Sequence, residues 1–113
     1  MYGKRILEEK TVEAAITLQF AGHDHTFNHF VRWGSGFLLG GEKPAEYAER
    51  PPSYGRKSSV STFGHPGQRS SLTWADREKD IALIFLVNTL VSDEDNAKRW
   101  ADLSDAVWNA IES

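Results

Sequence analysis

The sequence contains no cysteine, which excludes disulfide bonds, thiolate nucleophiles and zinc sites with cysteine ligands. It has no excess of basic residues either, because 13 Lys and Arg stand against 16 Asp and Glu and the formal net charge is −3. The basic residues are scattered along the chain, so we expect no nucleic-acid partner. No apolar run approaches the roughly 18 residues needed to cross a bilayer, and no signal-peptide core follows the first residues. We therefore expect a cytoplasmic protein with no membrane partner.

The chain is short, and its length limits its architecture. We expect its 113 residues to form a single domain over 1–113. Hydrophobic residues make up 40% and charged residues 26%, which is typical of soluble globular proteins and excludes disordered and fibrous classes. A chain of this length buries only about two-thirds of its unfolded surface. Any apolar element left uncovered would therefore favour a partner.

The first part of the chain predicts one helix and one strand. Apolar residues at helical spacing favour a helix within 6–18. Residues 19–29 lack a sustained period and contain several turn-forming residues, which is typical of a loop. Alternating apolar residues predict a strand over 31–39, in which Gly34 and Gly36 mark a bulge or a close backbone approach.

A long polar segment, residues 41–62, follows and carries three of the four prolines. A loop longer than about 15 residues inside a compact domain is commonly functional or mobile, so this one could act as a lid over a site. Its basic residues Arg50, Arg56 and Lys57 are expected to be solvated.

Three strands are predicted in quick succession after this segment, over 61–66, 70–76 and 81–88. Their short links favour antiparallel neighbours. The run from Ile81 to Val87 shows no polar alternation, which predicts a central strand with both faces covered.

A helix is predicted from Ser92 to near the C-terminus. Ser92 and Asp95 have the spacing of a capping box. An apolar stripe at helical spacing follows and includes Trp100, Leu103, Val107 and Ile111. Trp100 and Trp108 are expected in core and edge packing. The whole order predicts an α+β fold, with an antiparallel sheet packed by an N-terminal and a C-terminal helix.

The most specific local pattern is Phe-Gly-His-Pro-Gly at residues 63–67, followed by a strand that ends in Ala-Asp and an apolar strand that ends in Asn88. A Trp-Gly-Ser-Gly-Phe segment at 33–37 precedes it. These motifs closely resemble the C-terminal segment of the serine β-lactamase and penicillin-binding-protein superfamily, in its branch of class C-like esterases and D-aminopeptidases. Arg77 stands where that branch often has proline. The resemblance implies a partial β-lactamase-like fold, the C-terminal third of a larger serine hydrolase.

The resemblance also implies a binding wall. In this superfamily the His-x-Gly strand, here His65-Pro66-Gly67, replaces the Lys-Thr-Gly of true β-lactamases and lines the active site. Gly67 would let a substrate lie against the strand edge, and the backbone N–H of Gln68 would form half of an oxyanion hole. His65 would supply a polar or cationic group near the acyl site, which makes it the candidate catalytic residue; a strand-end residue without chemistry is the simpler alternative. With Trp33, these residues would line a ligand pocket that needs no metal or cofactor.

The other motifs of the superfamily are absent from these 113 residues. No Ser-x-x-Lys is present. Ser53-Tyr-Gly-Arg56 comes closest, but arginine stays protonated and is a poor proton acceptor. No tyrosine begins a Tyr-x-Asn or Tyr-x-Ser motif.

Three functions are compatible with this pattern. The missing motifs favour a non-catalytic, self-associating protein derived from a β-lactamase-like serine hydrolase. A small-molecule binding protein could instead use the residual acyl-site wall, and a pocket lined by Trp33, His65 and Gln68 would favour it. The third is part of a β-lactamase-like hydrolase or esterase that another chain completes.

Self-association is expected from the same resemblance. In the intact fold the strand that matches 81–87 also pairs with an N-terminal strand that has no counterpart here. Its absence would leave unpaired N–H and C=O groups along an apolar strand. We expect a homo-oligomer, most simply a two-fold dimer formed through strand 81–88 or by exchange of terminal helices.

Three of the four histidines lie close together in the predicted loop, at positions 23, 25 and 29. Alternating histidines on an extended segment point the same way and could offer a surface metal site. We expect these three histidines to be solvated loop residues, so no metal site is predicted.

Overall fold

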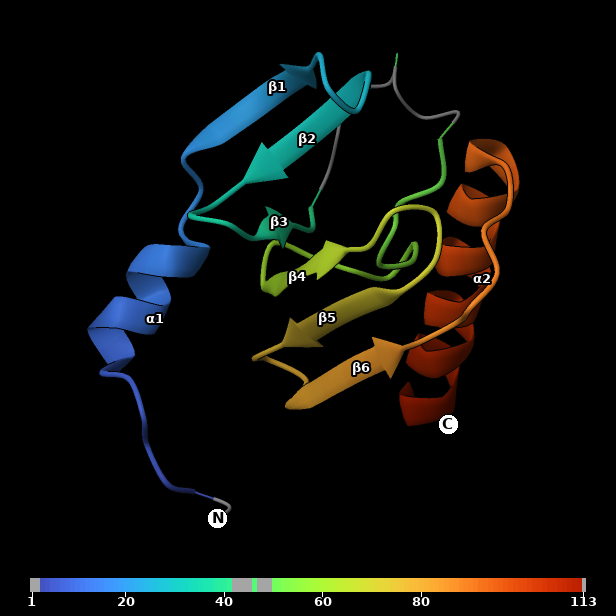
Figure 1. Cartoon of the computed structure of the whole chain (residues 1–113). Coiled ribbons are helices and arrows are strands. Elements are labelled where there is room, and N and C mark those ends of the chain that lie inside the picture. Colours follow the sequence, from blue (N-terminus) through green and yellow to red (C-terminus); the bar gives the residue numbers. More distant parts are fainter. Residues whose placement is uncertain (1–2, 42–45, 47–49, 113) are drawn as a thin grey trace.

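The computed structural model of the protein describes residues 3–41, 46 and 50–112, which form two helices and one antiparallel sheet. Six strands lie in the sheet in the order in which they follow one another along the chain (Figure 1). The elements are α1 (Glu9–Ile16), β1 (Phe20–Asp24), β2 (His29–Trp33), β3 (Leu38–Leu39), β4 (Thr62–Pro66), β5 (Leu72–Asp76), β6 (Ile81–Phe85) and α2 (Asp93–Glu112). The predicted α+β class with an antiparallel sheet is confirmed.

The predicted loop over 19–29 is wrong, because β1 and β2 form a hairpin there. Asp24 fixes the turn: its Oδ1 accepts hydrogen bonds from the backbone N–H groups of Thr26 (2.8 Å) and Phe27 (3.0 Å). Asn28 closes the turn with a φ of 58°, a conformation that asparagine tolerates. The polar residues that suggested a loop are the turn of a hairpin.

The predicted strand over 31–39 is two strands. β2 ends at Trp33, and β3 returns antiparallel to it with Leu38 opposite Trp33. The N–H of Gly34 donates a backbone hydrogen bond of 2.9 Å across the turn between them, and Gly36 has a φ of 82°, which favours glycine. The two glycines therefore mark a hairpin turn and not a bulge, but the alternative of a close backbone approach is confirmed at Gly34, where a Cβ would collide with the carbonyl oxygen of Ala15.

The predicted meander after the polar segment is confirmed as β4, β5 and β6. The buried carboxylate of Asp76 secures the meander at the end where β4 begins and β5 finishes. It accepts hydrogen bonds from the hydroxyls of Ser61 (3.1 Å) and Thr62 (2.7 Å) at the start of β4. It also accepts the backbone N–H groups of Glu78 (2.9 Å) and Lys79 (3.0 Å) in the β5–β6 turn. These donors offset the cost of burying a charged group.

α1 flanks one end of the sheet, and it is shorter than the helix predicted within 6–18. None of its residues is buried. Its C-terminal end meets the β2–β3 turn, where the N–H of Ser35 donates to the carbonyl of Ala15 (2.8 Å). Figure 1 shows residues 3–8 leading away from the sheet. The apolar side of this helix therefore has little protein against it.

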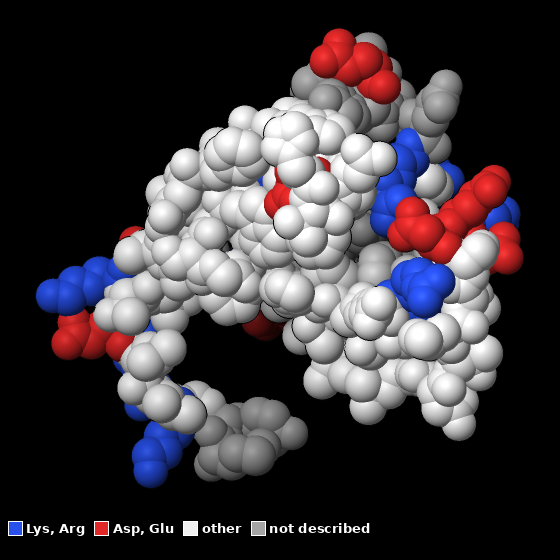
Figure 2. All heavy atoms as spheres, turned by 45° about the horizontal axis from the view of Figure 1, so that its top comes forward, with Lys and Arg blue, Asp and Glu red and all other residues white. Residues whose placement is uncertain are grey.

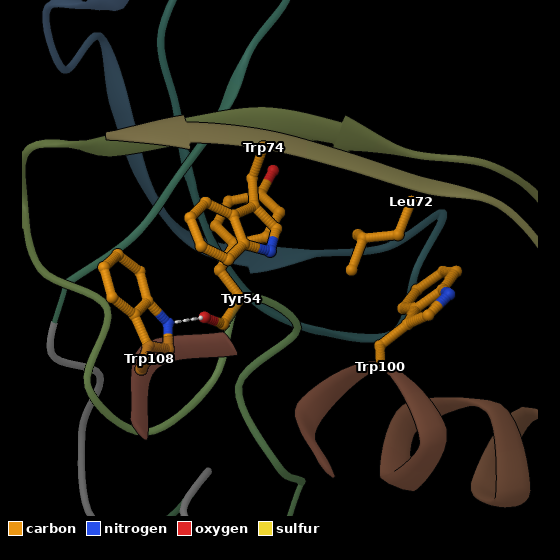
Figure 3. Close-up of a cluster of buried hydrophobic side chains, with 5 residues drawn as sticks. All are labelled: Tyr54, Leu72, Trp74, Trp100 and Trp108. Carbon is orange, nitrogen blue, oxygen red and sulfur yellow. Dashed lines mark hydrogen bonds between the residues drawn. The ribbon is translucent and has the colours of Figure 1, made fainter. Parts of the chain in front are cut away.

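α2 begins where the sequence predicts, because the Ser92 hydroxyl accepts a hydrogen bond from the N–H of Asp95 (3.1 Å). The side that it packs against one face of the sheet carries Trp100, Ala101, Ser104 and Trp108, whereas Ile111 of the predicted stripe is 43% exposed. The core lies between the helix and the sheet (Figure 3) and consists of Tyr54, Leu72, Trp74, Trp100 and Trp108. The predicted core positions of both helix tryptophans are confirmed. In the part of the chain that the structure describes, neither helix has the length and apolar character needed to cross a membrane.

The indole rings of Trp74 and Trp108 form the centre of this core. They stack with ring centroids 4.5 Å apart and an interplanar angle of 13°. Trp74 Nε1 donates to the Ser104 hydroxyl (3.0 Å), and Trp108 Nε1 donates to the Tyr54 carbonyl (2.7 Å). Each ring is therefore both buried and fixed in orientation.

Tyr54, in the second part of the predicted polar loop 41–62, belongs to the core; residues 42–45 and 47–49 lie outside the described residues. Tyr54 is only 2% exposed, and its hydroxyl donates to the carbonyl of Leu38 (3.0 Å). Burial raises the pKa of the Tyr54 phenol above its usual range. The expectation of a lid is therefore wrong for the residues around Tyr54.

The basic residues of this loop are not simply solvated, as the sequence suggested. They form ion pairs with α2, namely Arg50–Asp93, Arg56–Asp105 and Lys57–Glu112. Exposed pairs of this kind contribute about 0–1 kcal/mol each, so they orient the loop more than they stabilise it.

β6 forms an edge of the sheet, which contradicts its predicted central position. Its odd-numbered residues pack against the core beneath α2, whereas Ala82 and Ile84 point to the other face and are exposed. Ile84 is 70% exposed, and Leu86 beyond the strand is 77% exposed. Among the described residues, nothing covers this second apolar face of β6.

Replacing Trp108 by alanine should destabilise the fold by about 3–5 kcal/mol, because it removes the stacked ring and the buried donor to the Tyr54 carbonyl. Urea unfolding followed by circular dichroism measures the change. Leu90→Ala, at a side chain that is 57% exposed, is the control and should cost less than about 0.5 kcal/mol. Equal losses in the two variants would contradict the central role of Trp108.

Candidate functional site

A cavity of about 520 Å³ lies where the chain leaves β4 and approaches the start of α2. Its volume falls in the range of roughly 300–1,000 Å³ found for small-molecule sites. The four residues predicted to bind a ligand all line it: Trp33, His65, Gly67 and Gln68. Trp33 comes from β2 and His65 from β4, while Asn96 and Trp100 of α2 contribute the opposite side. The fold thus joins residues that are far apart in sequence.

His65 lies at the end of β4 with its side chain exposed. Its Nδ1 is 2.7 Å from the carbonyl oxygen of Pro66. A carbonyl oxygen can only accept, so Nδ1 carries a proton, and in the uncharged form of the ring Nε2 is therefore the hydrogen-bond acceptor. This tautomer suits a group that accepts a hydrogen bond or a proton from a bound ligand.

Gly67 and Gln68 form the turn that follows β4. The N–H of Gly67 donates to the carbonyl of Ser71 (2.7 Å), and a Cβ at position 67 would collide with the Ser71 hydroxyl. A larger residue here would require the Ser71 side chain to move, so Gly67 favours the close packing of this turn. No hydrogen bond within the described residues uses the backbone N–H of Gln68, which leaves it free to donate at the cavity.

Asp24, in the β1–β2 hairpin, holds Trp33 in position. Trp33 Nε1 donates to Asp24 Oδ2 (3.2 Å), while the other carboxylate oxygen accepts the two turn N–H groups. These hydrogen bonds, that of the Phe27 N–H above all, hold the pKa of Asp24 below its usual range. Neither Asp24 nor Phe27 was predicted as a site residue. The available signal was an aspartate within a run of turn-forming residues, because aspartate commonly accepts the backbone N–H two residues further on in an Asx turn.

Charged side chains gather on the side of the cavity next to α2. Arg50 donates to Asp93 Oδ2 (2.8 Å), and both residues line the cavity together with Arg69. The hydrogen bond from Arg50 lowers the pKa of Asp93. Figure 2 shows blue and red spheres adjoining at the side where α2 begins, whereas the middle of the face is mostly white. The cavity therefore has one charged wall and one largely apolar wall.

The segment that comes closest to a nucleophile motif does not form a nucleophile and base. Ser53 lines the cavity, but the guanidinium of Arg56 pairs with Asp105 of α2 and lies 3.8 Å from Asp102. Activation of a serine needs a base within hydrogen-bond reach. Ser53 and Arg56 do not supply that arrangement.

The three clustered histidines are mainly strand residues and not loop residues, because His23 lies in β1 and His29 in β2. The rings of His23 and His25 meet edge to face, with centroids 5.0 Å apart. Over residues 3–41, 46 and 50–112, no group of three His, Cys, Asp or Glu side chains is placed to hold a metal ion.

An antiparallel sheet with a His-x-Gly strand beside a cavity is the arrangement expected of the β-lactamase-like serine hydrolases. The chain matches the beta-lactamase family over residues 2–107 and belongs to that family. The predicted superfamily and partial fold are thereby confirmed.

Two solved structures resemble the chain over nearly its whole length. One is a β-lactamase from Mycobacterium bovis, with 27% sequence identity over 93% of this chain and a TM-score of 0.74. The other is EstA from Arthrobacter nitroguajacolicus, with 25% identity over 94% of this chain and a TM-score of 0.63. The chain spans 38% of the first protein and 25% of the second. No protein with a curated description matches it.

Acidification should release Trp33 from Asp24. Because the pKa of Asp24 is lower in the folded protein than in the unfolded chain, its contacts stabilise the fold fully above about pH 4 and lose this effect as the pH falls through the folded pKa. The NMR shift of the Trp33 indole N–H should show a transition below about pH 4. Asp24→Asn should lack this transition while keeping any change caused by the neighbouring His65 ring. The same transition below about pH 4 in Asp24→Asn would contradict control by Asp24.

Proposed function

We propose that this chain supplies the substrate-binding wall of a β-lactamase-like serine hydrolase and binds small acyl compounds in the cavity beside His65, without turning them over by itself. The observation that carries this proposal is the single cavity that joins Trp33, His65, Gly67 and Gln68. Membership of the beta-lactamase family supports it.

The expected contacts follow from the free polar groups at the cavity. The backbone N–H of Gln68 has no acceptor among the described residues and would donate to a carbonyl oxygen of the ligand. Nε2 of His65 would accept from a hydroxyl or amide N–H on the same ligand, since Nδ1 is held by the Pro66 carbonyl. Together these two groups would fix the orientation of an ester or amide.

The absence of turnover follows from the residues that the chain does not contain. No Ser-x-x-Lys and no Tyr-x-Asn stand within the 113 residues, and Arg56 is paired with α2. An active site of this type would therefore take its nucleophile from polypeptide outside these residues. In that event the chain would act as one part of a hydrolase or esterase.

Binding can be tested with 6-aminopenicillanic acid, a β-lactam without an aromatic substituent. In a two-dimensional amide NMR titration, the shifts should concentrate at residues 65–68 and at the Trp33 indole. His65→Ala should weaken binding several-fold, because it removes one of the two polar contacts. His23→Ala, in β1 and outside the cavity lining, is the matched control and should bind normally. Shifts confined to other residues would refute the proposed site.

Lack of turnover needs a separate test, with the chromogenic β-lactam nitrocefin and the ester 4-nitrophenyl butyrate. We expect the unmodified chain to hydrolyse neither substrate faster than His65→Ala does. Exposed histidines hydrolyse activated esters slowly, so His23→Ala measures how much a histidine outside the cavity contributes to this uncatalysed rate. Turnover that His65→Ala abolishes and His23→Ala preserves would show that the chain is catalytic after all.

A second function, self-association, is favoured by the exposed apolar edge at β6. We propose that a second copy of the chain pairs with β6 about a two-fold axis, because Ile84 and Leu86 are uncovered and edge strands readily pair with another chain. Exchange of α2 would remove Trp100 and Trp108 from their own core, so edge pairing is the simpler route.

Size-exclusion chromatography with light scattering should show a dimer at micromolar concentration. Ile84→Lys should yield a monomer, because a charge on an edge strand opposes pairing. Thr73→Lys is the control, since Thr73 lies opposite Ile84 on the next strand inward. Phe85 is less suitable, because it packs against the core and lies under the guanidinium of Arg99. A monomeric unmodified chain, or a dimer that Ile84→Lys leaves intact, would contradict the proposal.

A further inference from the structure

Four aromatic rings form a continuous row along one wall of the cavity. The ring centroid of Phe27 lies 5.9 Å from that of His29 and 6.0 Å from that of Trp33. The Trp33 ring lies 5.7 Å from that of His65. Neighbouring rings are tilted by 32–42°, and all four residues line the cavity. The row therefore ends at the His-x-Gly turn, where the polar groups of the site begin.

The row is held in place before any ligand arrives. Asp24 accepts hydrogen bonds from the backbone N–H of Phe27 and from Trp33 Nε1, so one carboxylate fixes two members of the row. His29 and Trp33 are strand residues of β2, and His65 is anchored to the Pro66 carbonyl. A rigid aromatic surface loses little conformational freedom when a ligand packs against it.

The aromatic row is not part of the hydrophobic core, so core packing does not account for its presence. Phe27 is 46% exposed and lies outside the core cluster beneath α2. Large side chains exposed in a cavity beside convergent polar groups are typical of ligand-binding sites. The opposite wall carries the Arg50–Asp93 ion pair, so the cavity would suit a ligand with one apolar and one polar end.

We propose that this cavity prefers acyl compounds that carry a planar aromatic ring, such as arylacetyl groups. The ring packs against Phe27 and Trp33, and the carbonyl or carboxylate reaches the turn at Gly67 and Gln68. Aromatic rings favour offset or edge-to-face contacts with centroids about 4.5–7 Å apart, the spacing that the row already shows. This inference rests on the proposed function of the cavity and specifies its ligand class.

The test compares phenylacetate with cyclohexylacetate, which has the same carboxylate and number of carbons but no planar ring. Amide NMR titrations of the intact chain give the dissociation constants and the residues affected. Contact of one ring with two aromatic side chains should make phenylacetate bind about tenfold more tightly. Both ligands should shift the amide signals of Gly67 and Gln68, whereas phenylacetate should shift the Trp33 indole signal more strongly.

Phe27→Leu supplies the decisive variant, because it keeps an apolar side chain and removes the ring. The preference for phenylacetate should fall to about threefold or less, while binding of cyclohexylacetate should stay unchanged. Phe20→Leu is the matched control: Phe20 lies in β1 of the same hairpin, is 49% exposed and does not line the cavity. Trp33→Leu provides a second measurement on the row if Phe27→Leu disturbs the hairpin.

The outcomes separate this inference from the proposed function. If both ligands bind equally and shift the amide signals of residues 65–68, the cavity binds acyl compounds but the aromatic preference is wrong. If 6-aminopenicillanic acid and both acids leave those signals unchanged, the proposed function fails as well. A preference that survives both Phe27→Leu and Trp33→Leu would refute the role of the row.

Discussion

The stack of Trp74 on Trp108 is the contact on which the rest of the structure depends, because it joins the sheet to α2. The hydrogen bond from Trp108 to the Tyr54 carbonyl adds the loop before β4 to the same contact. Tyr54 in turn donates to the carbonyl of Leu38 in β3. One aromatic cluster therefore connects β3, β5, the loop and α2. The cavity takes part of its lining from the elements that this cluster connects, and Trp100 belongs to both, so the shape of the cavity depends on the packing of the core.

The two faces of the sheet differ in their surroundings. One face packs against α2, while Ile84 of β6 lies on the other, opposite Thr73, which pairs with His65 of β4. Directly paired residues share a face of a sheet, so His65 and Ile84 lie on the same side. His65 and the uncovered apolar surface therefore share a face, whereas Trp33 follows the pairing of Leu38, Gly64 and Trp74 and lies on the face toward α2. Any polypeptide that covered Ile84 would also approach His65.

The sequence predicted the elements whose signals are local and strong. The meander was recognisable from its short links, α2 from its Ser92 cap and apolar stripe, and the four lining residues from their motifs. It failed where one residue serves two purposes. Asp24 reads as a loop residue, yet its carboxylate both forms a hairpin turn and holds Trp33. Similarly, Tyr54 lies among prolines and charges, and only α2, about fifty residues further on, makes it a core residue. In β6, half-buried and exposed residues alternate, but the sequence did not show this alternation because the residues on both faces are apolar.

The strict sequence order of the six strands has a consequence for how the chain folds. Each strand pairs with the strand that follows it, so the hairpin contacts of β1–β2, β2–β3 and the meander close only short loops. Topologies with such local contacts fold faster than those that need distant pairing. The exception is the pairing of β3 with β4, which brings together Leu39 and Phe63 across the Tyr54 loop. The two halves of the sheet can therefore form as separate units, and Tyr54, which is hydrogen-bonded to Leu38 on one side and to Trp108 on the other, connects them in the folded chain.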